Sequence, residues 1–185
     1  METAERIDKA VRPTLKALDA VVSLIDRAKE TSVPLKGSVW NVATSRIIGL
    51  ERFDASARDL RRELREWQEE SKNLERSLRE LETALEEADE GDTDYELIVE
   101  EFEEAMRSME ALDEKSSRVE SKLRDASERS AKIAKKAGDL PVLGSDIQER
   151  FDVLSRRLSQ TADEVVRVNR KPSDVLDVRP VPDSE

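Results

Sequence analysis

The chain has 185 residues, of which 41% are charged and 3% are aromatic, and its net charge is −11. It contains no cysteine and no histidine. This excludes disulfides, zinc sites of the Cys/His type, cysteine nucleophiles and histidine-based acid–base mechanisms. The length fits one domain, and the abundance of Ala, Glu, Leu, Lys and Arg is typical of long helices and coiled coils.

The first expected helix covers residues 3–31, where apolar residues recur three and four positions apart. Pro13 conflicts with this pattern, because a proline inside a helix costs about 3 kcal/mol. It therefore marks either a kink or the true start of the helix. The bases and acids of this segment nearly balance, which argues against a helix that lies on lipid. Pro34 and Gly37 then separate it from the next helix.

The second expected helix covers residues 38–89 and has the most regular pattern. From Leu50 to Leu85 the apolar positions alternate three and four apart, with only Ser71 polar, as in a coiled coil. Before Leu60 the apolar residues surround much of the helix, whereas beyond it only a narrow seam is apolar. A wide apolar surface requires several neighbouring helices.

The wide apolar part of the second helix predicts a core shared with the outer helices. We expect Trp40, Ile47 and Phe53 to be buried there, together with residues from the first and last helices. The expected partners are Leu18, Ile25, Phe151 and Leu158.

The third and fourth expected helices cover residues 93–138 and 145–169. The third keeps its heptad phase with Ser116 and Ser130 as polar members. Each helix begins with a capping-box pattern, in which a side chain at either end of the box satisfies a free backbone amide. The pairs are Thr93 with Glu96 and Ser145 with Gln148. The proline-rich segment 170–185 is expected to be a non-helical tail.

Short connections place consecutive helices antiparallel, and the inner two helices are longer than the outer two. We therefore predict an all-α fold, in which an antiparallel four-helix bundle base is extended by a two-helix coiled-coil hairpin stalk. The prediction is a single elongated domain over residues 1–169, with the stalk at about 60–115.

The acidity is concentrated near the turn of this hairpin. Residues 86–115 contain 14 acidic side chains and only two basic ones, so this segment accounts for the whole negative charge. The negative charge of this segment disfavours binding of nucleic acid, which is itself negatively charged. Three interpretations stay open: a solubilising cap, a docking surface for a basic protein, and a calcium site. For calcium, Asp92, Asp94, Glu96 and Glu103 match loop positions, but Leu97 stands where the loop needs glycine.

Three apolar residues near the turn lie off the heptad seam, among many carboxylates. They either widen the packing stripe or form a contact surface for a partner. The hypothetical partner-binding residues are Leu97, Val99, Glu100, Glu103, Glu104 and Met106.

No phosphate-binding glycine loop and no Gly-x-Ser-x-Gly elbow occur. We therefore expect a non-enzymatic structural or adaptor protein, without cofactor, metal or small-molecule substrate. Its partner would be a protein with a basic surface, or a second copy of the chain. The alternative is a soluble helical domain of a membrane-anchored or membrane-associated protein. Since no apolar run approaches the roughly 18 residues of a spanning helix, a cytoplasmic location is expected.

Overall fold

The computed structural model describes residues 3–31, 49–88, 93–139 and 144–169, and all regular structure in these ranges is helical. This confirms the all-α fold class. The helices are α1 (Thr3–Thr31), α3 (Leu50–Glu87), α4 (Thr93–Gly138) and α5 (Gly144–Asn169). Their lengths are 29, 38, 46 and 26 residues. The predicted bounds of the first, third and fourth helices agree within one residue, and the expected tail 170–185 lies outside the described residues.

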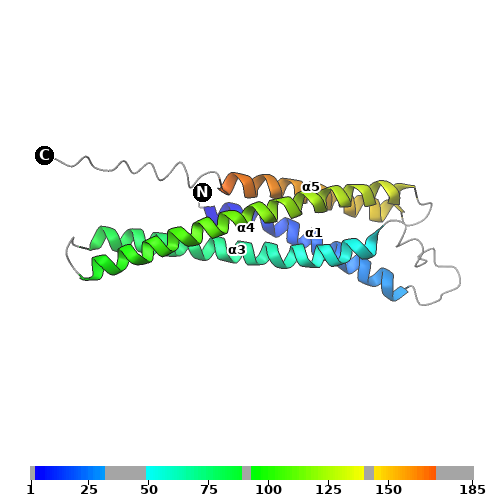
Figure 1. Ribbon diagram of the computed structural model, residues 1–185. Coiled ribbons are helices and arrows are strands. Elements are labelled where there is room, and N and C mark those ends of the chain that lie inside the picture. The colour runs from blue at the N-terminus through cyan, green and yellow to red at the C-terminus, as the bar shows by residue number, and fades with distance from the viewer. Residues whose placement is uncertain (1–2, 32–48, 89–92, 140–143, 170–185) are drawn as a thin grey trace.

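Each helix packs mainly against two others, in the ring order α1–α3–α4–α5, with α5 returning to α1 (Figure 1). Neighbouring helices run antiparallel. Between α1 and α5, for example, Arg6 pairs with Glu164 at 3.3 Å. Further along, Thr14 donates a hydrogen bond to the carbonyl of Arg157 at 3.2 Å. The first and last described helices therefore lie side by side and close the ring.

Large apolar side chains from all four helices fill the centre. Phe53 on α3 and Phe151 on α5 meet across the ring, with centroids 5.2 Å apart and planes at 65°. This is the edge-to-face arrangement that aromatic rings prefer. The prediction of a shared core is confirmed for every expected member with a described side chain: Leu18, Ile25, Phe53, Phe151 and Leu158. Trp40 and Ile47 lie outside the described residues.

Gly49 corrects the expected start of the second helix. It has φ 81°, a left-handed conformation that glycine adopts without steric penalty. Its carbonyl accepts the first backbone hydrogen bond of α3, from the amide of Phe53 at 3.1 Å. The prediction of one uninterrupted helix over 38–89 is therefore wrong, and α3 begins at Leu50. The apolar pattern continues across Gly49, so periodicity alone did not reveal the break.

α1 continues through Pro13, so this proline does not mark the start of the helix. Because proline has no backbone N–H, the carbonyl of Lys9 loses its usual helical partner. The next carbonyl, that of Ala10, accepts a hydrogen bond from the hydroxyl of Thr161 on α5 at 3.1 Å. Contact with α5 thus supplies a hydrogen bond at the turn that the proline weakens.

The turn end of the α3–α4 hairpin extends beyond the first residues of α1 and the last residues of α5 (Figure 1). Along α3, α1 reaches as far as Lys72, whose ammonium lies 2.8 Å from the carboxylate of Asp8. Arg61 lies 2.6 Å from Asp19. A boundary near residue 60 is therefore wrong on this helix. In this stretch α1 and α3 share the apolar core, and ion pairs add to their contact.

On α4, Leu112 still packs against the core. We use "hairpin end" for residues 73–88 and 93–111, and "base" for the rest of the described chain.

Candidate functional site

The seam between α3 and α4 is closed in the base and partly open in the hairpin end. Leu60, Leu64 and Trp67 are at most 2% exposed. Leu78 and Leu81, which continue the same seam, are only half-buried. The difference arises because each helix of the hairpin end packs against one neighbour, whereas each helix of the base packs against two.

The apolar residues predicted to form one surface lie on two sides of α4. At 3.6 residues per turn, Val99 and Met106 are within about 20° of each other around the helix axis. Leu97 is roughly 160–200° away from both. Accordingly Leu97 is 55% exposed, while Val99 and Met106 are half-buried. The prediction that all three share one surface is therefore wrong, because α4 is continuous through them.

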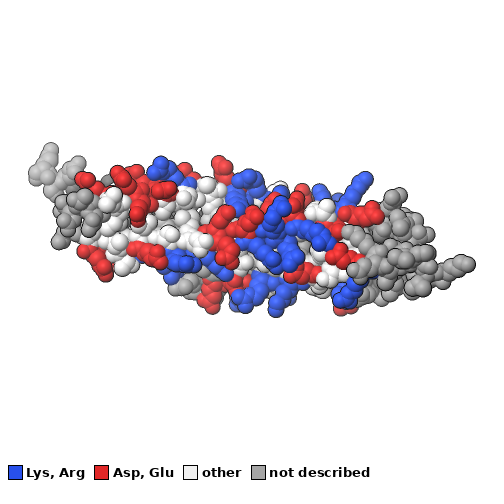
Figure 2. All heavy atoms as spheres, turned by 90° about the horizontal axis from the view of Figure 1, so that it is seen from below, with Lys and Arg blue, Asp and Glu red and all other residues white. Residues whose placement is uncertain are grey.

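The predicted carboxylates divide in the same way, and all three are exposed. By helical rotation Glu103 lies beside Val99 and Met106, Glu104 lies beside Leu97, and Glu100 lies between the two sides. Figure 2 shows uncharged surface bordered by acidic side chains at the hairpin end, whereas Lys and Arg gather over the middle of the molecule. The acidic character predicted for this end is thus displayed on its surface.

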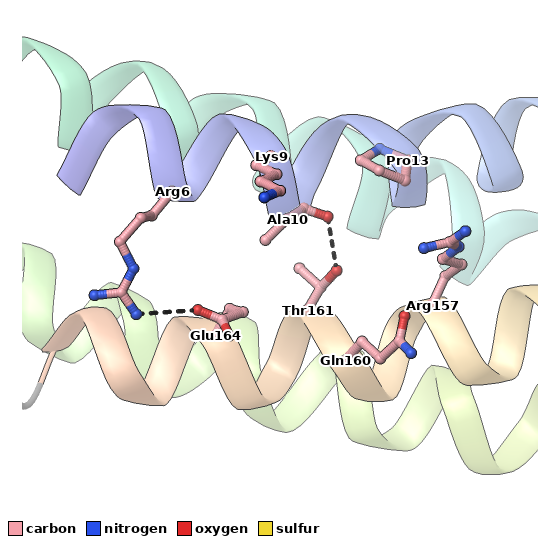
Figure 3. Close-up of a pocket in the computed structure, with 8 residues that line it drawn as sticks. All are labelled: Arg6, Lys9, Ala10, Pro13, Arg157, Gln160, Thr161 and Glu164. Carbon is pink, nitrogen blue, oxygen red and sulfur yellow. Dashed lines mark hydrogen bonds and ion pairs between the residues drawn. The ribbon is translucent and has the colours of Figure 1, made fainter. Parts of the chain in front are cut away.

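A groove of about 300 Å³ lies between α1 and α5 in the base (Figure 3). Its charged lining consists of Arg6, Lys9, Arg157 and Glu164. Glu164 pairs with Arg6, and the hydroxyl of Thr161 donates to the backbone of α1. The acceptor of that hydroxyl is a backbone carbonyl, which is not a base that could activate the hydroxyl as a nucleophile. No sequence pattern indicates this groove, because it combines residues about 150 positions apart.

A polar cluster around Asp8 joins α1 to α3 at the border of the hairpin end. One carboxylate oxygen accepts hydrogen bonds from the amide of Gln68 at 2.7 Å and the ammonium of Lys72 at 2.8 Å. The other oxygen pairs with Arg12. The hydrogen bond from Lys72 is the main reason that the pKa of Asp8 lies below its usual value of 3.8, and burial opposes it. The sequence did not predict this cluster, since its members come from two helices.

Asp8→Asn is expected to lower the free energy of unfolding at neutral pH by roughly 0.5–1 kcal/mol, as for other partly exposed ion pairs. The folded pKa is lower than the unfolded pKa, so the stabilisation is complete above the usual value of 3.8. It is lost as the pH falls through the lower folded value. Urea denaturation of both proteins between pH 3 and 7 measures this, and the two curves should converge at the acidic end. A difference that does not depend on pH would show that the charge of Asp8 does not contribute.

Among the described residues, no group of three or more carboxylates is arranged to hold a metal ion. Residues 94–103 lie within α4, so the calcium-loop interpretation of this stretch is wrong, because such a loop is not helical. No helix in the described ranges is long and apolar enough to cross a membrane.

Comparison of the chain with protein-family models, curated proteins and solved structures gives no significant match.

Proposed function

We propose that this chain is a non-enzymatic helical adaptor or structural protein, which binds a basic protein partner through its hairpin end. The observation that carries the proposal is the coincidence of two features on a part of the molecule that α1 and α5 do not cover. The net negative charge of the chain is concentrated there, and apolar side chains there are half-buried or exposed.

The two features have different roles in binding. Apolar atoms contribute affinity when they leave water, at roughly 25 cal/mol per Å². Carboxylates attract a basic partner over a distance of about 10 Å at ordinary salt, and they repel acidic proteins. A surface that combines them selects partners by charge and holds them by apolar contact.

Reversing the charge of the hairpin end is expected to abolish partner binding. Glu103→Lys with Glu104→Lys changes two exposed side chains of the hairpin end, one on each side of α4. Glu69→Lys with Glu128→Lys makes the same charge change at two exposed positions of the base. Proteins captured from a native extract by the unmodified chain should be lost with the first variant and retained with the second. Capture should also weaken as salt is raised.

Two results would contradict this proposal. One is equal capture by the unmodified chain and the hairpin-end variant. The other is equal loss with both variants, which would indicate unspecific attraction to negative charge. A second copy of the chain as the partner is tested by sedimentation of the purified protein at low and high salt.

A further inference from the structure

The packing of α4 against α5 in the base is informative about the hairpin end. Ser127 on α4 and Ser155 on α5 exchange hydrogen bonds, each hydroxyl donating to the carbonyl of the other residue, at 2.8 Å and 3.0 Å. One turn earlier on α4, the guanidinium of Arg124 lies 3.2 Å from Asp163 on α5 and 2.7 Å from Glu120 on its own helix. The face of α4 that contacts α5 therefore contains the heptad positions of Ser127 and Arg124.

The same face of α4 continues into the hairpin end. Met106 and Val99 precede Ser127 by three and four heptads, and Glu110 and Glu103 precede Arg124 by two and three. The apolar seam of α4 repeats every seven residues from Tyr95 to Ala137, and helices with such a repeat keep positions seven apart on one face. α5 ends at Asn169, and Val99 and Met106 remain half-buried. We call Val99, Glu103, Met106 and Glu110 the distal face.

In the base this face carries a base and an acid that pair with each other, Arg124 and Glu120 at 2.7 Å, whereas both charged residues of the distal face are acidic. Arg124 also pairs with an acidic residue of α5. In the distal face the heptad position of Arg124 is occupied by Glu103 and Glu110. A helix that continued the path of α5 would therefore need basic residues where α5 has Asp163.

The adjoining face of α3 has the same sign. Gln68 contacts α1 in the base, and the residues one and two heptads further along α3 are Glu75 and Glu82. Glu75 pairs with Arg79 at 2.6 Å, so one base lies among these acids. Both helices thus present carboxylates on the side of the hairpin that α1 and α5 cover in the base.

We propose that the distal face binds a basic amphipathic helix of a partner protein, antiparallel to α4 and continuing the path of α5. This inference rests on the function proposed above and specifies its partner. Val99 and Met106 supply the apolar contact, and Glu103 and Glu110 pair with Lys or Arg of the incoming helix. A second copy of the hairpin end is a poor occupant, because it would place like charges opposite one another.

The test uses the full chain and a synthetic three-heptad peptide, with leucine on one face and lysine on the other, as the probe. Isothermal titration should give one peptide per chain. Val99→Glu with Met106→Glu is expected to weaken binding about tenfold or more, since it removes the apolar contact. Val99→Ala with Met106→Ala, which favours helix formation, should weaken it about threefold or more. A peptide with glutamate in place of lysine should not bind.

The matched control is Leu97→Glu with Ala111→Glu. It adds the same charge at two exposed positions, which lie on the opposite side of α4 and two heptads apart. This variant should weaken binding less than about threefold, as expected for a general charge effect without loss of contact. Circular dichroism should show the same helix content for all variants.

Several outcomes would overturn the proposal. Equal weakening by the distal-face and control variants would indicate unspecific electrostatic attraction. Dimerisation of the chain without peptide, abolished by Val99→Glu with Met106→Glu, would make a second copy the occupant. If capture from extract depends on Glu103 and Glu104 but not on Val99 and Met106, the proposed function stands and this inference fails. If neither pair affects capture, both fail.

Discussion

Phe53→Ala is expected to lower the free energy of unfolding by about 3–5 kcal/mol, the usual range for deletion of a large buried aromatic side chain. Phe53 is 2% exposed, and it meets Phe151 edge-to-face at the centre of the ring. The substitution removes that aromatic contact and leaves a cavity between α3 and α5. Because opposite sides of a close-packed ring border this space, neighbouring side chains can fill it only partly. Urea denaturation followed by circular dichroism measures the effect.

The matched control is Leu81→Ala, in the hairpin end. Leu81 is half-buried on the same helix, so its truncation removes less apolar area from the packed interior and leaves no closed cavity. The expected loss is about 1–2 kcal/mol. If Leu81→Ala were the more destabilising change, the base would not be the main source of stability.

Ser116→Ala is expected to lower the free energy of unfolding by about 1–3 kcal/mol, although it removes only one oxygen atom. The indole N–H of Trp67 donates to the hydroxyl of Ser116 at 2.7 Å, and both residues are at most 1% exposed. Without that hydroxyl the indole N–H is buried and unpaired, which carries the full cost of its desolvation. Denaturation of the variant measures the loss, and Trp67→Phe in the same background should restore part of it.

Ser130→Ala is the matched control for this change. Ser130 is also fully buried on α4, and its hydroxyl has no hydrogen-bond partner among the described residues. Its removal should change the free energy of unfolding by less than about 0.5 kcal/mol or increase it, since a buried unpaired hydroxyl is unfavourable. Equal losses for the two serine variants would show that the bond to Trp67 does not contribute.

The sequence predicted the seams of α3 and α4 well, because contacts between antiparallel neighbours repeat every seven residues and leave a local pattern. It could not explain the polar positions within those seams. Ser71 and Ser116 interrupted the apolar series, and the structure shows both bound to Trp67, the first to its carbonyl and the second to its indole. The bond to Ser116 joins two helices, and such a bond has no signature in the spacing of either one.

The contacts of α1 could not be predicted from the sequence, for a related reason. Its pairing with α5 joins residues as far as 158 positions apart, and its pairing with α3 uses ion pairs that resemble ordinary surface charge. The grouping of Leu97 with Val99 and Met106 is a different kind of error. A rotation of about 100° per residue already separates them, so the spacing of these residues itself indicates two sides of the helix.

The ring arrangement makes helix length the quantity that determines how much of the hairpin is exposed. α3 continues about 15 residues beyond Lys72, or roughly 22 Å at 1.5 Å per residue. One heptad added to each of α3 and α4 near their turn would lengthen the hairpin end by about 10 Å and keep its seam in phase. One heptad added to the end of α5 would cover a similar length of the distal face. The reach of the binding surface can therefore change in steps of seven residues, independently of the core that stabilises the fold.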